Sequence, residues 1–180
     1  MNKILLENNY LYVENFLAPE KARELYDGFK ELSVSHPHKF RNDAQCPKSL
    51  ATINYDPFVE LLLDSVPFLQ DTVEEKLTPT YSYARAYKNG DMLAPHTDID
   101  ACEVSVTLHL GSDGVEWPIY FTKPNGEVVG MNLQPGQGVI YLGCVSEHWR
   151  DTYEGYEYGQ VFLHYVRSRK PDGNYFFNKA

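Results

Sequence analysis

The sequence lacks the features of a chain that enters or crosses a membrane. No hydrophobic run approaches the roughly 18 residues of a membrane-spanning helix. The first ten residues carry one lysine and one short apolar run, Ile4 to Leu6, which does not predict a signal peptide. Cys46, Cys102 and Cys144 lie far apart, and an odd count without a secretory signal favours reduced thiols over disulfides. We therefore expect a cytoplasmic protein without a membrane partner.

Basic residues are also scarce. The chain has 16 Lys and Arg against 25 Asp and Glu, which gives a formal net charge of −9. A field of that sign repels nucleic acid at long range, and the sequence has no Lys/Arg cluster that suggests a basic groove. Hydrophobic residues make up 43% and charged residues 23% of the 180 residues, a balance typical of a folded globular chain. We expect one domain over residues 1–180 that binds no nucleic acid.

The N-terminal part of the chain, about 1–78, has mainly helical patterns, with a short strand predicted at residues 11–13. The stretch 19–32 begins with proline and glutamate, which suit a first helical turn, and continues with apolar residues at helical spacing. A second helix is predicted over 56–65, and Pro67 ends or kinks it. The intervening segment 33–54 predicts a loop, long enough to serve as a lid over a site.

From about residue 79 to 167 the pattern is typical of β-structure. The segment Pro124-Asn125-Gly126 predicts a hairpin turn between two short strands. Several strands at regular spacing favour a sandwich or barrel, so the fold class is mainly β with N-terminal helices packed on one outer face (α+β). The predicted strands cover residues 81–87, 104–110, 118–122, 127–131, 139–142 and 160–166.

One group of side chains suggests metal chemistry. His96 and Asp98 are two residues apart, so on a strand they point to the same face and can bind one ion. His148 follows a predicted strand that could return it to the same place. Two histidines and one carboxylate on one face of a metal are typical of non-haem Fe(II) oxygenases. Taken alone, however, His-x-Asp suits a surface pair equally well.

The surrounding motif is more specific. Residues 85–98 read Arg-x-Tyr-x-x-Gly-x-x-Leu-x-x-His-x-Asp. This stretch resembles the 2-oxoglutarate/Fe(II)-dependent dioxygenases, most closely their prolyl 4-hydroxylase-like branch and a small microbial and phage-type subgroup of it. The segments 105–111, 133–141 and 13–20 resemble the strand, the Pro-x-x-Gly turn and the opening of the same branch. The resemblance extends from about residue 11 to 166.

The resemblance implies a fold, cofactors and a reaction. The fold is a double-stranded β-helix, a jelly-roll or cupin-like barrel, with Fe(II) bound by His96, Asp98 and His148. The cosubstrates are 2-oxoglutarate, which chelates the iron, and O₂, with ascorbate as an optional reductant. The reaction hydroxylates an unactivated C–H bond and releases succinate and CO₂. In this branch the substrate is a prolyl residue of a peptide or protein.

The chain departs from the family where 2-oxoglutarate is usually anchored. The family places an Arg or Lys about ten residues after the second ligand histidine, and here that residue is Tyr158. The nearest cation is Arg150, which shares a strand face with His148 and can bind a carboxylate with two hydrogen bonds. We expect Arg150 and Tyr87 to anchor the cosubstrate, with Gln160 assisting.

Other assignments stay open at this stage. Arg85 and His164 are candidates for contacts with substrate or with the metal ligands, or for structural roles. The substrate could instead be a free amino acid or another small molecule. The missing family anchor also leaves open a catalytically silent metal-binding barrel. The oligomeric state is not predicted.

Overall fold

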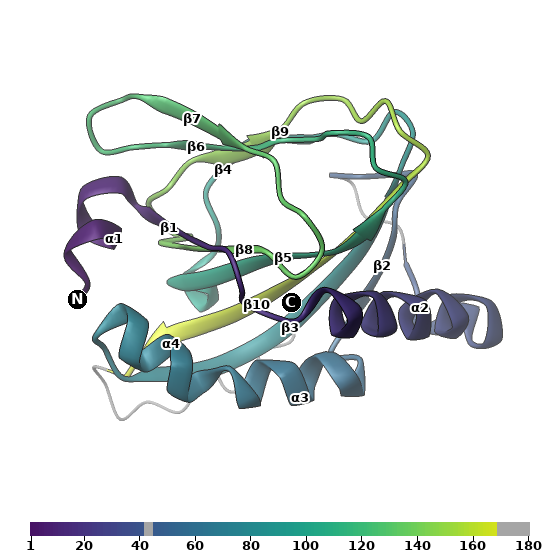
Figure 1. Ribbon diagram of the computed structural model, residues 1–180, viewed down its shortest axis with the longest axis horizontal. Helices are drawn as coiled ribbons and strands as arrows, with labels where there is room; N and C mark the ends of the chain where they lie inside the picture. Colours follow the sequence, from purple (N-terminus) through teal and green to yellow (C-terminus); the bar gives the residue numbers. More distant parts are fainter. Residues whose placement is uncertain (42–44, 169–180) are drawn as a thin grey trace.

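The computed structural model describes residues 1–41 and 45–168. Two antiparallel sheets face each other, and the helices lie outside one of them (Figure 1). The larger sheet has the strand order β1-β8-β5-β10-β3-β2, and the smaller sheet has the order β4-β9-β6-β7. The strands are β1 Tyr10–Val13, β2 Leu50–Ile53, β3 Leu77–Lys88, β4 Leu93–His96, β5 Val104–Ser112, β6 Ile119–Thr122, β7 Val128–Met131, β8 Gly138–Tyr141, β9 His148–Arg150 and β10 Glu157–Arg167.

The helices cover the outer face of the larger sheet, as the sequence predicts. Helix α2 begins at a proline, whose missing N–H costs nothing in the first turn, and it packs on β5. Helix α3 packs on β3 and β10. No helix in the described ranges is long and apolar enough to cross a membrane. The α-helices are α1 Lys3–Asn8, α2 Pro19–Ser35, α3 Asp56–Asp64 and α4 Val66–Val73, and the short 3₁₀ helices are η1 Pro37–Lys39 and η2 Asp100–Cys102.

Two glycines let α2 approach the sheet closely. Gly111 on β5 pairs with Gly159 on β10, and the ring of Tyr26 from α2 lies over both. A Cβ at position 159 would overlap the Tyr26 ring, and one at 111 would lie 2.9 Å from its Cδ1. Glycine is therefore required here because the helix leaves no room for a side chain.

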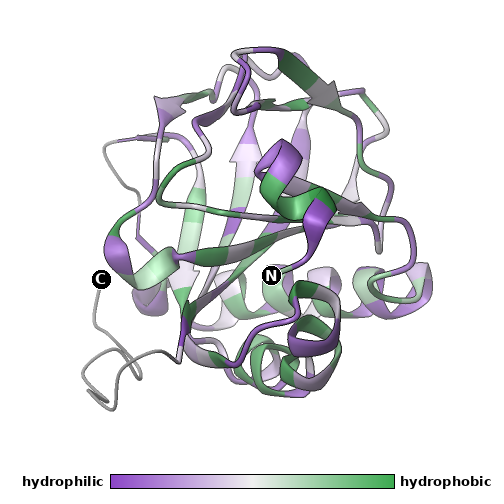
Figure 2. Ribbon diagram, turned by 90° about the vertical axis from the view of Figure 1, so that its left-hand side faces the viewer, coloured by the Kyte–Doolittle hydropathy of each residue, from purple (hydrophilic) through white to green (hydrophobic). Residues whose placement is uncertain are grey.

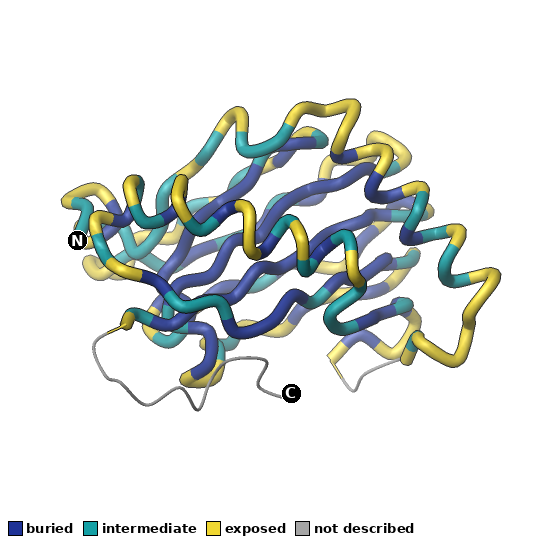
Figure 3. Tube along the Cα trace, turned by 90° about the horizontal axis from the view of Figure 1, so that it is seen from below, coloured by how far each residue is buried: buried dark blue, intermediate teal, exposed yellow. Residues whose placement is uncertain are grey.

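The strands of the larger sheet divide their residues between two environments. Alternate side chains face the helices and form the main apolar core, which includes Leu108 of β5 and Leu163 of β10. The side chains between them face the smaller sheet, and many of those are polar although they are buried. Hydrophilic and hydrophobic residues succeed each other along these strands (Figure 2), while the strands themselves stay buried over most of their length (Figure 3).

The sequence predictions need correction in the N-terminal part. The loop predicted over 33–54 contains β2, which pairs with β3 and forms one edge of the larger sheet. Strand β1 forms the opposite edge and confirms the short strand predicted at residues 11–13, so the region 1–78 contributes strands as well as helices. A four-residue strand such as β2 has too few residues to show a clear period of two, so its pairing decides its conformation. None of the three cysteines forms a disulfide.

Candidate metal centre

The predicted ligands meet in the smaller sheet. His96 is the last residue of β4 and His148 the first of β9, and the two are direct partners in the antiparallel pair. Asp98 does not lie on a strand, contrary to the sequence prediction. It follows β4 in a loop, and its backbone N–H donates to the carbonyl of Gly143 at 2.9 Å. Strand pairing and that loop contact, rather than strand alternation alone, bring the three side chains together.

The ligand atoms converge on one point. Asp98 Oδ1 lies 3.7 Å from His96 Nε2 and 3.7 Å from His148 Nε2, and one ligand atom of each residue lies within 4.8 Å of the others. The Nδ1 atoms of His96 and His148 are each 2.9 Å from a backbone carbonyl oxygen, of Ala94 and Ser146 respectively. An Nδ1–H that donates to a carbonyl leaves Nε2 unprotonated and directed at a metal. This donor set fits a divalent iron.

Asp98 is held in a space that only glycine leaves open. A Cβ at position 143 would lie 2.5 Å from Asp98 Oδ2 and would also overlap the backbone carbonyl of Cys102. Ser105 Oγ donates to Asp98 Oδ2 at 3.3 Å. The carboxylate therefore presents Oδ1 to the two histidines while Oδ2 is held on the other side.

The three ligands line a cavity of about 340 Å³. Burial lowers the pKa of His148, which keeps the imidazole neutral and able to bind a metal. Burial also lowers the pKa of His164 in the same cavity to about 4. The sequence missed several further lining residues, although Tyr81 shares its strand face with Arg85 and could have been found by alternation. The missed residues include Arg41, Gln45, Tyr81, Tyr83, Cys102 and Tyr141.

Arg150 is fully enclosed inside the barrel. Its guanidinium carbon lies 4.6 Å from the ring centre of Trp117 and 4.8 Å from that of Tyr158. Nη1 donates to the Trp117 carbonyl, and Nη2 donates to Gln160 Oε1 at 2.9 Å. Its Nε has no hydrogen-bond partner, and no carboxylate of the described residues forms an ion pair with Arg150. A buried cation without a countercharge is costly, so this guanidinium is suited to an anion.

The remaining predicted residues are divided between the cavity and the deeper interior. Arg85 lines the cavity, and its Nη1 donates to Tyr87 Oη at 3.2 Å. Tyr87 is buried beside Trp117, and burial raises the pKa of its hydroxyl. Gln160 donates to Thr107 Oγ1 and accepts a hydrogen bond from Arg150. The bond with Arg150 connects the larger sheet to the smaller one. Arg150, Tyr87 and Gln160 do not line the cavity of the triad, whereas Arg85 and His164 do.

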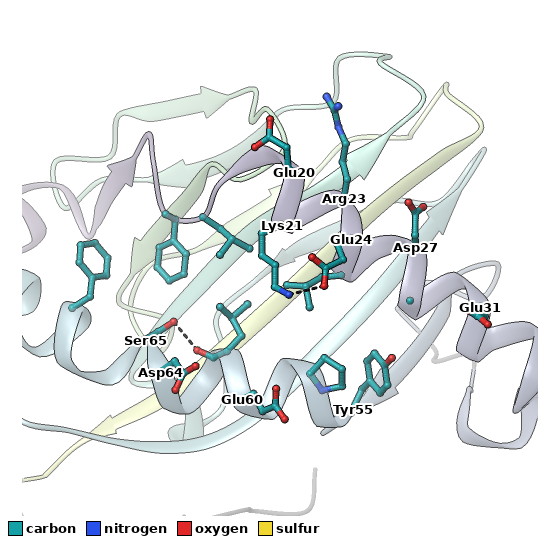
Figure 4. Close-up of a pocket in the computed structure, with 17 residues that line it drawn as sticks. Glu20, Lys21, Arg23, Glu24, Asp27, Glu31, Tyr55, Glu60, Asp64 and Ser65 are labelled. Atoms are coloured by element: carbon teal, nitrogen blue, oxygen red, sulfur yellow. Dashed lines mark hydrogen bonds and ion pairs between the residues drawn. The ribbon is translucent and has the colours of Figure 1, made fainter.

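A larger hollow lies outside the barrel and away from these ligands. It has a volume of about 1180 Å³ and separates α2 from α3 on the outer surface. Figure 4 shows carboxylates along its rim, among them Glu20, Glu60 and Asp64, and an ion pair between Lys21 and Glu24. Its carboxylates are spread along the rim, and no group of metal-ligand atoms converges there among the described residues.

Solved structures decide the fold. A prolyl-4-hydroxylase from Pseudomonas putida matches with a TM-score of 0.75 and 14% identity over 91% of this chain and 95% of that one. The protein has the double-stranded β-helix fold of the 2-oxoglutarate/Fe(II)-dependent dioxygenases. That fold was predicted from the motif at residues 85–98 and is confirmed. No protein-family model and no curated protein matches the sequence.

Two further structures with the dioxygenase fold are similar to this chain over most of its length. One is a prolyl hydroxylase from Trichoplax adhaerens in complex with a hypoxia inducible factor peptide, with a TM-score of 0.71 and 15% identity over 92% of this chain and 86% of that one. The other is HygX from Streptomyces hygroscopicus with nickel and 2-oxoglutarate bound, with a TM-score of 0.72 and 12% identity over 92% of this chain and 85% of that one. At these identities the likeness shows the fold alone.

Proposed function

We propose that the whole chain, residues 1–180, forms one Fe(II)- and 2-oxoglutarate-dependent dioxygenase domain that hydroxylates an unactivated C–H bond. One observation carries the proposal: two histidine Nε2 atoms and one aspartate Oδ1 converge at a cavity within a double-stranded β-helix. Two histidines and a carboxylate leave the other coordination positions of an iron open for a cosubstrate and O₂. A zinc-type structural site would instead use four protein ligands.

The chain's own residues bind and orient the reacting groups. Bound iron, with 2-oxoglutarate and O₂, supplies the oxidation and yields succinate and CO₂ as co-products. His96 and His148 would hold the metal through Nε2, in the tautomer that their backbone hydrogen bonds select. Asp98 would supply the anionic oxygen, through the Oδ1 atom that lies 3.7 Å from each histidine Nε2. Ascorbate serves as an optional reductant that keeps the iron divalent.

Arg150 is our proposed partner for the far carboxylate of 2-oxoglutarate, with Gln160 and Tyr87 beside it. The support is its burial without a countercharge and the unpartnered Nε. Arg85 is the competing cation because it lines the cavity of the triad. Binding at Arg150 requires the Trp117 side chain or the Gln160 amide to give way. Binding at Arg85 would compete with the hydrogen bonds that its Nη2 donates to Gln45 and Tyr83.

For the substrate we propose a prolyl residue of a peptide or protein, bound across the mouth of the cavity. The support is the sequence resemblance together with two neighbours described as prolyl hydroxylases, one of them in complex with a peptide. A small-molecule substrate is the second candidate, because neighbours also include an epimerase and a carbocyclase of nogalamycin biosynthesis. The volume of about 340 Å³ also lies at the small end for a ligand pocket. None of the three cysteines forms a disulfide, which suits a reducing compartment, so we propose a cytoplasmic location.

The direct test is anaerobic absorption spectroscopy of the protein with Fe(II) and 2-oxoglutarate. Chelation should give a weak visible charge-transfer band, and His96→Ala should abolish it. If iron-loaded wild type gives no band, the dioxygenase proposal fails and the protein is a metal-binding barrel of another kind. If the band is present, succinate release in air measures turnover. Candidate peptides and amino acids are then compared by how strongly each stimulates succinate release.

The same band locates the anchor. Arg150→Lys keeps the charge but loses the paired hydrogen bonds, so it should weaken 2-oxoglutarate binding if Arg150 is the anchor. Arg85→Lys is the matched variant on the cavity wall and should then bind 2-oxoglutarate nearly as wild type does. The reverse result would assign the anchor to Arg85. Thermal unfolding of both variants controls for loss of the fold.

A further inference from the structure

A second set of potential metal ligands lies on the other side of Asp98. Asp98, Cys102 and His164 each offer one ligand atom, and these atoms all lie within 4.8 Å of one another. Ser105 connects this side, because its Oγ contacts Asp98 Oδ2 at 3.3 Å and His164 Nδ1 at 2.8 Å. The two oxygens of Asp98 therefore have different neighbours: Oδ1 is close to the iron-type histidines, and Oδ2 contacts Ser105 Oγ, which in turn contacts His164.

We propose that Cys102, His164 and Asp98 form a second metal site that accepts Zn²⁺ or Co²⁺. The chemistry of the ligands sets the choice of ion. A thiolate with an imidazole and one carboxylate favours borderline-soft ions that accept tetrahedral coordination, whereas two imidazoles and a carboxylate with open positions suit Fe(II). Three protein ligands would leave a fourth position to water or another small ligand.

The proposed site is preorganised and open to solvent on one side. Cys102 and His164 are 2% and 5% exposed, and both line the same cavity of about 340 Å³ as the first triad. Tyr81 Oη lies 3.2 Å from Cys102 Sγ, and the Tyr81 ring lies 4.6 Å from the His164 ring. Tyr81 therefore fixes the position of both side chains and can donate to the sulfur of a metal-bound thiolate.

Sharing Asp98 makes the two sites interdependent. A carboxylate can bridge two cations through its two oxygens, as in two-metal sites with ions about 4 Å apart. The second cation then binds next to a first positive charge, so it should bind more weakly than the first. The proposal does not rest on the proposed dioxygenase activity, because it concerns the binding of a metal alone.

Cobalt titration of the metal-free protein tests the second site. Anaerobic addition of Co²⁺ to wild type should load two equivalents, and the second should bring the near-ultraviolet charge-transfer band of a thiolate bound to Co²⁺. His96→Ala weakens the first site and leaves the second site intact. In this variant the first equivalent of Co²⁺ should therefore already give the thiolate band. Cys102→Ser should abolish the band in both backgrounds and keep one equivalent in the otherwise wild-type protein.

The other cysteines provide matched controls. Cys144 lies outside the cluster, where its Sγ contacts the backbone oxygen of Ile99 at 3.3 Å, so Cys144→Ser should keep the band. His164→Gln should lose the band although every thiol is present, which separates a metal site from a lone reactive cysteine. Uptake of a single equivalent without a thiolate band, or a band that survives Cys102→Ser, would overturn the proposal. Circular dichroism confirms that each variant is folded.

Discussion

The two faces of the larger sheet are formed by the same strands but differ in the polarity of their side chains. Toward the helices, β5 and β10 present aliphatic side chains such as Leu108 and Leu163, which are completely buried. Toward the smaller sheet, the intervening residues are polar and equally buried, among them Thr107, Gln160 and His164. Burial is therefore not what separates the faces. One face excludes polar groups, and the other encloses them with hydrogen-bond partners and a cavity.

This difference assigns separate tasks to alternate residues of one strand. The outer face contributes most of the hydrophobic free energy, because burial of a large aliphatic side chain stabilises by about 1.5–3 kcal/mol. The inner face contributes less, since a net hydrogen bond is worth only about 1 kcal/mol. In return it holds metal-ligating and charged groups at fixed positions. Substitutions on the two faces should therefore have different consequences.

The largest effect on stability is expected from the outer face. Leu163→Ala leaves a cavity between β10 and the helices and should lower the free energy of unfolding by about 2–5 kcal/mol. Denaturant unfolding measures the loss, and metal binding should persist wherever the variant stays folded. The neighbouring inner-face variant His164→Gln is the control, with a smaller loss. Equal losses from the two substitutions would remove the distinction between the faces.

The inner face should be the acid-sensitive one. Burial and the nearby Arg150 lower the pKa of His109 to about 4, while its Nδ1 contacts the Leu133 carbonyl oxygen at 2.7 Å. Above pH 6.5 the histidine is neutral in both folded and unfolded states, so it adds no pH dependence. Between pH 6.5 and 4 only the unfolded state gains the proton, and stability should fall by an amount on the order of 3 kcal/mol.

His109→Asn isolates that contribution, because asparagine can still donate to the Leu133 carbonyl and does not titrate. The difference in unfolding free energy between variant and wild type should shift in favour of the variant as the pH falls from 6.5 to 4. Denaturant unfolding at several pH values measures the difference. Parallel pH profiles for the two proteins would show that His109 carries no such linkage.

A smaller effect is expected where α2 meets the sheet. Gly159→Ala places a methyl group into the Tyr26 ring and should destabilise by about 1–3 kcal/mol through overpacking. Gly28→Ala is the matched control: the nearest atom to its new Cβ is 3.5 Å away, and alanine favours a helix by up to about 1 kcal/mol. Tyr26→Leu combined with Gly159→Ala should recover part of the loss in a double-mutant cycle. Additive losses would mean that the ring is not what fills the space.

The sequence was sufficient for the fold class and for naming three side chains, His96, Asp98 and His148, whose candidate ligand atoms lie close together in the structure. Strand alternation gave the β-rich half, and His96, Asp98 and His148 are recognisable because they belong to a linear motif with a separate histidine. What alternation did not give was the conformation around Asp98. That residue lies in a loop whose course depends on the backbone contact with Gly143, some 45 residues away in the chain.

Contacts between distant parts of the chain explain the other features that the sequence did not predict. Cys102, which lies just before β5, joins the cavity only because β5 pairs with β10, which no local pattern reveals. Trp117 encloses Arg150 because its Nε1 donates to the Asp151 carbonyl at 2.7 Å, a contact between two loops. Strand β2 was predicted as loop since its conformation is set by pairing rather than by its own residues.

The smallest effect is expected at Ser105, on the inner face between the two ligand groups. Ser105→Ala removes the donor to Asp98 Oδ2 and a partner of His164, while the methyl group fits the space of the hydroxyl. Stability should fall by about 1–2 kcal/mol, because the hydrogen bonds to Asp98 Oδ2 and His164 Nδ1 are both lost and a net hydrogen bond is worth about 1 kcal/mol. The affinity for a first divalent metal should fall by about tenfold, since partners of a ligating carboxylate typically contribute that much. Isothermal titration with Co²⁺ measures it, and Ser82→Ala, whose buried hydroxyl has no partner among the described residues, is the control. An unchanged affinity would mean that the backbone contact to Gly143 alone orients Asp98.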